Sequence, residues 1–191
     1  MKEKNIIIIK RYESPCGNLT LGSYGDKLCL CDWQVESHRN HVDRRLKKML
    51  NAEFELGTST VIETAVKELD EFFAGTRRDF DVPLLFVGTD FQKTVWNELL
   101  KIPYGKTVSY GEMARRIGNP NAVRALANAN GANSISIFAP CHRVIGSDNS
   151  LTGYGGGLEA KRKLLTLEGA FSEGVDHRFM PGIHNVLDFR K

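Results

Sequence analysis

The amino-acid sequence predicts two parts of different fold class, an α/β N-terminal half and a mostly helical C-terminal half. Segments 5–11, 18–23 and 28–34 are rich in β-forming residues and are separated by turn residues, so they are expected to be strands. Helical periodicity follows them, and it dominates after residue 88. Strands that precede helices indicate an α/β or α+β domain.

Two helices are expected to complete the first half. Residues 39–50 place apolar side chains at helical spacing, and the Arg and Lys residues between them indicate a solvated basic face or, as a weaker alternative, a DNA-binding patch. Thr60 and Glu63 form a capping-box pattern, and the apolar stripe that follows them ends at Gly75. A linker is expected at 76–88, and the first domain at 1–86.

Helix-start signals recur through the second half. Thr89 and Gln92 form a capping-box pattern, and Ser109 opens another. A last helix is expected over residues 158–168, whereas the segment after it lacks clear periodicity. These signals predict a second domain and a loosely held tail, at residues 87–170 and 171–191.

A helix-turn-helix is predicted between Ser109 and Gly131. Its first helix ends at Gly118, and Asn119 is expected to cap the second helix, with Pro120 at the first position. That second helix carries one charge, Arg124, and has alanines at positions 122, 125, 127 and 129. Major-groove readers usually present several polar side chains, so a slim alanine-rich helix favours the narrower minor groove, although small residues also permit close helix packing.

Composition bounds the class of protein. The 191 residues carry a net charge of +3 and have a mean hydropathy of −0.29, which indicates a soluble globular protein and does not by itself establish nucleic-acid binding. The apolar run Ile6–Ile9 is too short to cross a membrane, and no signal-peptide pattern follows it.

The four cysteines form no CxxC pair, which argues against a disulfide framework and fits a reducing cytoplasm. Cys29 and Cys31 are expected to share one face of a strand. With Cys16, His38 or His41 they could form a zinc site, but the spacing of zinc ribbons is missing, so small buried hydrophobes are the better interpretation. We therefore expect no metal.

Residues 140–144 read Pro-Cys-His-Arg-Val and combine a thiol with a neighbouring base. Only a thiolate attacks, so a reactive Cys141 requires a base such as His142 nearby, and Pro140 suits a rigid turn that presents the sulfur. An isolated pair of this kind is more often a buried structural cysteine beside a surface histidine.

The surrounding motifs decide between these interpretations. From Thr89 to Gly169 the chain contains FQ..VW..L..IPYG.T.SYGE.A, GNP.AVRA, N.ISI..PCHRVIGS and LTGY.GGLE.K..LL..EG in order. This stretch resembles the C-terminal domain of the O6-alkylguanine-DNA alkyltransferases (methylated-DNA–protein-cysteine methyltransferases), above all the bacterial members. The first half resembles the family more loosely, through SPCGNLTLGSYGDKL.

The resemblance implies an RNase H-like N-terminal domain and a winged-helix-like C-terminal domain that contains the helix-turn-helix. It implies irreversible transfer of a methyl or other alkyl group from guanine O6, and also from thymine O4, to a cysteine of the protein itself, without a cofactor. The implied partner is double-stranded DNA, bound through its minor groove with the damaged base flipped out. We expect a cytoplasmic monomer that does not contact membranes.

The resemblance also assigns the reacting residues. Cys141 accepts the alkyl group, His142 deprotonates it through a bridging water, and Glu168 orients the histidine. Tyr110 hydrogen-bonds guanine N3, and Arg124 enters the base stack. Taken alone, Glu168 could be a surface carboxylate, Tyr110 a residue at the edge of the core, and Arg124 a phosphate contact.

Further positions follow from the same match. The remaining DNA-contacting residues are Ala122, Ala125 and Asn128. Asn133 matches a brace for the active-site turn, with an ordinary loop cap as the alternative. Leu151–Gly157 matches a lid over the pocket, whose lining includes Val144, Leu151, Tyr154 and Gly155. The lid glycines are expected to allow backbone N–H groups close to the base O6. A phosphate cradle is disfavoured, because no lysine follows them in P-loop register.

Two other functions compete with this assignment. A non-enzymatic protein that recognises alkylated DNA would lack the reactive cysteine, which is present here. A helix-turn-helix regulator would require a more polar recognition helix and a dimer interface. Phe138-Ala139 stand where the family more often has two aliphatic residues, and this difference is expected to affect packing beneath Cys141.

Overall fold

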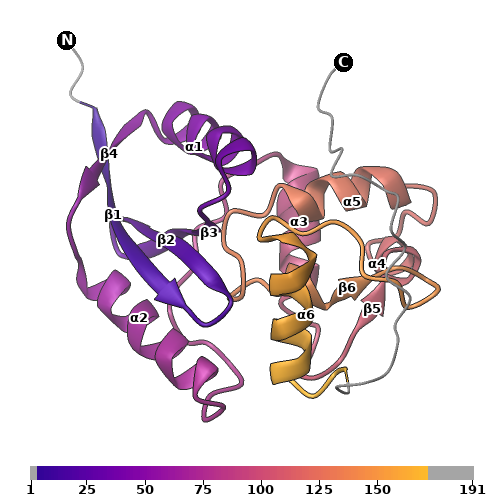
Figure 1. Cartoon of the computed structure of the whole chain (residues 1–191). Coiled ribbons are helices and arrows are strands. Elements are labelled where there is room, and N and C mark those ends of the chain that lie inside the picture. Colours follow the sequence, from indigo (N-terminus) through magenta and orange to yellow (C-terminus); the bar gives the residue numbers. More distant parts are fainter. Residues whose placement is uncertain (1–3, 172–191) are drawn as a thin grey trace.

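The computed structural model describes residues 4–171 and forms an N-terminal sheet domain beside a helical C-terminal domain (Figure 1). The predicted tail at 171–191 lies outside the described residues apart from Phe171. The N-terminal elements are β1 (Asn5–Ser14), β2 (Gly17–Tyr24), β3 (Lys27–Trp33), α1 (Glu36–Leu50), β4 (Ala52–Leu56) and α2 (Thr60–Phe73).

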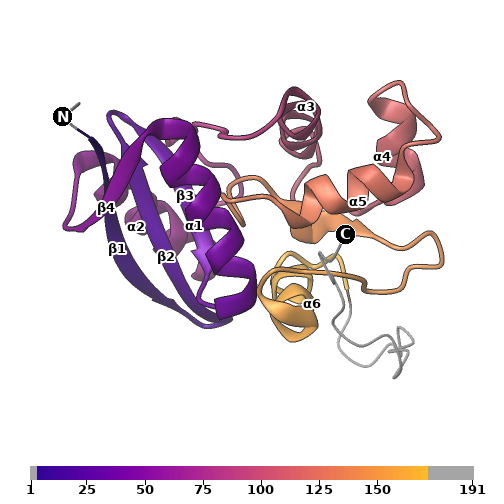
Figure 2. The same cartoon turned by 90° about the horizontal axis from the view of Figure 1, so that it is seen from above.

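The N-terminal sheet has the strand order β3-β2-β1-β4. The first three strands form an antiparallel meander, and β4 pairs parallel to β1 after the crossover through α1. Helix α1 lies on one face of this sheet and α2 on the other (Figures 1 and 2). Strand β4 was not predicted from the sequence, because five residues directly after a helix give too short an alternating pattern.

The prediction that Cys29 and Cys31 share a face was wrong. Leu30 pairs with Gly22 and Leu28 with Ser23, so Cys29 is an extra residue in the strand and forms a β-bulge. Cys29 consequently packs in the core beneath α1, whereas Cys31 packs in the core beneath α2. Within residues 4–171, no three His, Cys, Asp or Glu side chains are arranged to hold a metal ion.

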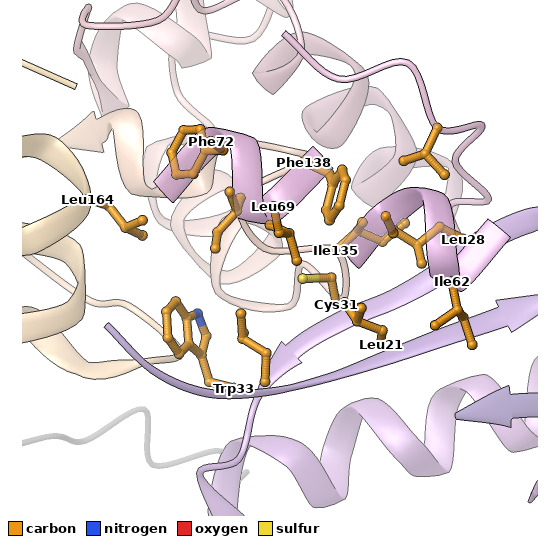
Figure 3. Packing of buried hydrophobic residues seen from close by; sticks show 14 of the residues in the cluster. Leu21, Leu28, Cys31, Trp33, Ile62, Leu69, Phe72, Ile135, Phe138 and Leu164 are labelled. Atoms are coloured by element: carbon orange, nitrogen blue, oxygen red, sulfur yellow. The ribbon is translucent and has the colours of Figure 1, made fainter. Parts of the chain in front are cut away.

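The larger core joins the two domains. Leu21, Cys31 and Trp33 of the sheet pack against Ile62, Leu69 and Phe72 of α2, and residues from the second half close this core (Figure 3). The C-terminal residues that reach it include Ile135, Phe138 and Leu164.

The C-terminal domain carries the predicted run of helices. Its elements are α3 (Asp90–Leu99), β5 (Val108–Ser109), α4 (Tyr110–Arg116), α5 (Val123–Gly131), the 3-10 turn η1 (Cys141–Arg143), β6 (Val144–Ile145) and α6 (Gly157–Leu167). Strands β5 and β6 form a short parallel pair. The described part of the chain contains no helix that is both long and apolar enough to cross a membrane.

The observed helix N-termini confirm some of the predicted helix starts and contradict two others. The capping box of Thr89 and Gln92 is confirmed. At α2 the predicted capping box of Thr60 and Glu63 is wrong, because Ser59 is the N-cap and accepts from the amide of Ile62, whose side chain cannot complete a box. Helix α5 begins at Val123 rather than at Pro120, because residues 119–122 form a turn closed by the Ala122 amide and the Asn119 carbonyl.

The edge of β3 binds segments that do not belong to the sheet. The amide of Leu28 donates to the Pro83 carbonyl at 2.8 Å, so the predicted linker at 76–88 is held against the sheet. Further along the same edge, the Cys31 amide donates to Ser134 and the Cys31 carbonyl accepts from Ser136. The loop that leads to Cys141 is thereby fixed to the N-terminal sheet.

Candidate functional site

The loop before Cys141 is held in a strained conformation by a buried asparagine. The Asn133 side chain donates to the Ala139 carbonyl at 2.9 Å and accepts from the Ile135 amide at 3.0 Å. Between these contacts Ile137 has a φ of 74°, which is unusual for a β-branched residue. Asn133 therefore braces the turn from which η1 begins, and η1 places Cys141 in a nearly buried position, 5% exposed.

His142 and Glu168 form a buried pair beside Cys141. Nε2 of His142 lies 2.7 Å from Oε1 of Glu168, and both side chains are fully buried. Glu168 caps the C-terminus of α6, so the carboxylate reaches η1 from a distant part of the sequence. His142 Nδ1 is buried and has no hydrogen-bond partner among the residues the structure describes, so one ring nitrogen is available to a proton donor.

Arg143 and Gly105 complete the surroundings of Glu168. Arg143 donates from Nε and Nη2 to the two carboxylate oxygens at 2.9 Å each, and from Nη1 to the Ile102 carbonyl at 2.5 Å. The Gly105 amide donates to Glu168 at 3.3 Å. Gly105 has a φ of +71°, and a Cβ there would lie 2.8 Å from the Glu168 carbonyl oxygen, so a larger residue would displace this contact.

These surroundings determine the protonation states of Glu168, His142 and Cys141. Burial opposes ionisation of Glu168, but the hydrogen bonds from His142 and Arg143 and the positive charge of Arg143 outweigh it and lower the Glu168 pKa to about 2. Burial lowers the pKa of His142, so the imidazole is neutral at pH 7 and can accept a proton. Burial also raises the pKa of the Cys141 thiol, against hydrogen bonds from Asn133 and Ser136, so formation of the thiolate requires a base.

Lys161 links the lid (residues 151–157) to β6, the short strand that follows η1. Its ammonium donates to the Val144 carbonyl at 2.6 Å and to the Thr152 carbonyl at 2.7 Å, and the side chain is fully buried. Burial lowers the Lys161 pKa to about 8, while the nearby Cys141 opposes this shift. Lys161 was not predicted as a site residue, because a lysine in a helix is typical of a solvated surface position.

A groove of about 680 Å³ runs along α5 and opens toward the site. Its walls come from α4, α5 and the lid, and its lining residues are Tyr110, Asn121, Val123, Arg124, Ala127, Gly131, Thr152 and Gly153. Arg124 is exposed, and Tyr110 opens α4. Burial raises the pKa of Tyr110 against a hydrogen bond with Thr152, so its phenol remains a proton donor at neutral pH.

A second cavity, of about 10 Å³, adjoins the groove and reaches Cys141. Gly131 and Gly153 line both spaces. The other lining residues of the small cavity are His38, Asn130, Asn133, Ser136, Cys141, Tyr154 and Gly155. Asn133, Tyr154 and Gly155 were expected at the pocket, whereas His38, Asn130 and Ser136 were missed.

The structure does not bring all predicted positions to these spaces. Val144 is buried in the core and offers its carbonyl to Lys161, and Leu151 lies on the lid outside both linings. Ala125 and Asn128 are exposed on α5, and Ala122 is its N-cap, but none of these three lines the groove.

The lid glycines contact side chains of the N-terminal domain. A Cβ at Gly155 would lie 2.9 Å from His38 Nε2, and a Cβ at Gly156 would lie 2.4 Å from Cδ2 of Trp33. The Trp33 ring also packs edge-on against Tyr154, with centroids 5.7 Å apart. Glycine at these two lid positions is therefore required by packing between the domains, a reason that the sequence did not reveal.

Comparisons with known proteins agree over both halves of the chain. The family described as "6-O-methylguanine DNA methyltransferase, ribonuclease-like domain" matches residues 7–86, and "6-O-methylguanine DNA methyltransferase, DNA binding domain" matches residues 90–170. A methylated-DNA–protein-cysteine methyltransferase of Mycobacterium bovis is 44% identical over 166 residues, which are 85% of this chain and 93% of that protein. An inducible one of Bacillus subtilis is 49% identical over 115 residues, which are 60% of this chain and 64% of that protein.

Solved structures show the same fold. The crystal structure of Mycobacterium tuberculosis OGT in complex with DNA has a TM-score of 0.73 and 44% identity, over 85% of this chain and 93% of that one. The O6-methylguanine-DNA methyltransferase of the archaeon Pyrococcus kodakaraensis, 23% identical with a TM-score of 0.60 over 85% of this chain and 99% of that one, supports the fold alone. On these matches across both domains, the chain belongs to the family of methylated-DNA–protein-cysteine methyltransferases.

Proposed function

We propose that this protein repairs DNA by transferring an alkyl group from guanine O6, and also from thymine O4, to its own Cys141. The observation that carries the proposal is the buried hydrogen bond between Glu168 and His142, next to Cys141. Cys141 lines the small cavity that adjoins the groove along α5. Such an arrangement can generate a thiolate where a flipped base would enter.

The proposed reaction begins with DNA in the groove. Helix α5 enters the minor groove through its exposed face, which carries Arg124, Ala125 and Asn128. The damaged base leaves the stack, and Arg124 fills the gap that it leaves. This step is supported by Arg124, which lines the same groove as the lid residues Thr152 and Gly153.

The alkyl transfer takes place at the sulfur of Cys141. His142 removes the thiol proton through a water molecule at Nδ1, while Glu168 accepts from Nε2 and stabilises the imidazolium. The thiolate attacks the alkyl carbon, a C–S bond forms, and the C–O6 bond breaks with its electron pair on guanine. Tyr110 donates a hydrogen bond to N3 of the departing base, which takes up a proton from solvent to become neutral guanine, and His142 releases the thiol proton to solvent. The thioether at Cys141 is not reversed, so each molecule reacts once.

We expect the protein to act as a monomer, because the proposed reaction uses His142, Glu168 and Tyr110 from the same chain as Cys141 and needs no group from a second chain. The four cysteines are free thiols, and this supports action in the reducing cytoplasm. No step requires a cofactor.

The test is a stoichiometric transfer assay with a duplex that contains O6-methylguanine. The number of guanines restored should equal the number of active protein molecules and then stop rising. Cys141→Ser should restore none while it still binds the duplex. Continued turnover beyond one methyl group per protein would refute the proposal.

A further inference from the structure

The small cavity next to Cys141 has an unusual lining. Its nine residues are three glycines and six residues with polar or sulfur-bearing side chains, with no aliphatic side chain among them. An alkyl group that leaves guanine O6 would ordinarily gain from apolar surroundings. The cavity holds about 10 Å³, enough for one small group such as a hydroxyl or a water.

Asn130 offers an unsatisfied polar atom at this cavity. It is 3% exposed, and its Nδ2 donates to the Cys141 carbonyl at 3.4 Å. Its Oδ1 is buried and has no hydrogen-bond partner among the described residues. A buried acceptor without a donor costs free energy, so a ligand that supplies an O–H would be favoured over one that does not.

His38 brings a second polar group from the N-terminal domain. The ring lines the cavity and is largely buried, with its side chain 14% exposed. Its Nε2 lies 3.2 Å from Oδ1 of Asp32, a fully buried carboxylate, and this contact fixes the ring orientation. The edge of the ring meets Gly155, where any side chain would displace it. Because Nε2 is engaged by Asp32, a hydroxyl in the cavity would have to hydrogen-bond to Nδ1 of His38.

We propose that this cavity selects short O6-alkyl groups that end in an uncharged hydroxyl, such as 2-hydroxyethyl, with His38 and Asn130 as the specificity-determining residues. The inference rests on the proposed transfer to Cys141. It states which alkyl groups the cavity favours over apolar groups of equal size. The reacting carbon lies at the sulfur, and the terminal hydroxyl enters the cavity. The nine lining residues include no lysine or arginine, so an anionic group such as carboxymethyl would find no cationic side chain among them to offset the cost of its burial.

The test compares two alkyl groups with equal numbers of heavy atoms. Single-turnover rates are measured on duplexes that carry O6-(2-hydroxyethyl)guanine or O6-(n-propyl)guanine. The wild-type protein should react about fivefold faster with the hydroxyethyl group, the effect of one hydrogen bond. His38→Phe keeps a ring of similar size, and Asn130→Leu keeps the side-chain volume, so either variant should bring the ratio to about one. The ratio cancels any loss of rate that both substrates share.

His41→Phe, three residues further along α1 and outside the cavity, is the matched control and should keep the wild-type ratio. A wild-type ratio near one, or a ratio unchanged in both His38→Phe and Asn130→Leu, would overturn the inference. Faster reaction with O6-carboxymethylguanine than with hydroxyethyl would overturn the preference for an uncharged group. If instead no alkyl group, methyl included, reached Cys141, the proposed function itself would fail.

Discussion

Replacing Glu168 with Gln keeps the shape of the side chain and removes its charge. Glu168 accepts hydrogen bonds from His142 at 2.7 Å, from Arg143 at 2.9 Å twice, and from the Gly105 amide at 3.3 Å. Gln would leave the buried Arg143 guanidinium without a counter-charge, a change that typically costs about 3–5 kcal/mol. The pKa gives an independent figure. A fall from 4.5 to about 2, at roughly 1.4 kcal/mol per unit, corresponds to about 3 kcal/mol.

The sign of the pH dependence follows from the lowered pKa. The stabilisation by the Glu168 carboxylate is complete above pH 4.5 and is lost as the pH falls toward about 2. Urea denaturation should therefore show wild type more stable than Glu168→Gln by about 3 kcal/mol at pH 7, with a difference that shrinks through this acid range. The exposed Glu63→Gln on α2 is the control and should match wild type within ~0.5 kcal/mol. A difference that did not depend on pH would refute the electrostatic account.

The same variant should slow transfer at neutral pH. Without the carboxylate, His142 is a weaker base and its tautomer is no longer fixed, so a loss of about 100-fold or more is expected. The rate should recover partly in alkali, where solvent hydroxide forms the Cys141 thiolate. A pH–rate profile equal to that of wild type would remove Glu168 from the mechanism.

Three further variants test separate parts of the account. Tyr110→Phe should slow alkyl transfer about tenfold and leave DNA affinity nearly unchanged, and equal losses in both would indicate a structural tyrosine. Arg124→Ala should slow repair of a duplex about 100-fold and of a short single strand far less, because only the duplex requires unstacking; parallel losses would contradict the proposed role. Gly156→Ala should destabilise the protein by about 1–3 kcal/mol in urea denaturation, since its Cβ would clash with Trp33, whereas Gly111→Ala in α4 should not; equal stabilities would refute the packing argument.

The features that could be predicted from the sequence are those that depend on local patterns or on the family motifs. The cap at Thr89 and the Cys141-His142 pair could be identified because the relevant residues are neighbours in the chain. The bulge at Cys29 could not, since it depends on how β3 pairs with β2. The prediction that helix α5 starts at Pro120 failed because a turn competes there with the helix.

Contacts between the domains were the least predictable part of the site. His38 lies more than a hundred positions before Cys141 in the sequence, and it reaches the cavity only because the edge of β3 binds the loop at 134–136. Helical periodicity assigns His38 only to a helix start. The same packing explains Gly155 and Gly156, which the family resemblance assigned to approach of the base.

The central claim is that Cys141 itself becomes the alkyl acceptor. The most direct measurement is the intact mass of the protein after incubation with an excess of O6-methylguanine duplex, followed by mapping of the modified peptide. The account predicts a gain of one methylene mass, located on Cys141, in every active molecule, and no gain in Cys141→Ser. Restored guanine without any mass change, or a methyl group found on Cys16, Cys29 or Cys31 instead, would contradict it.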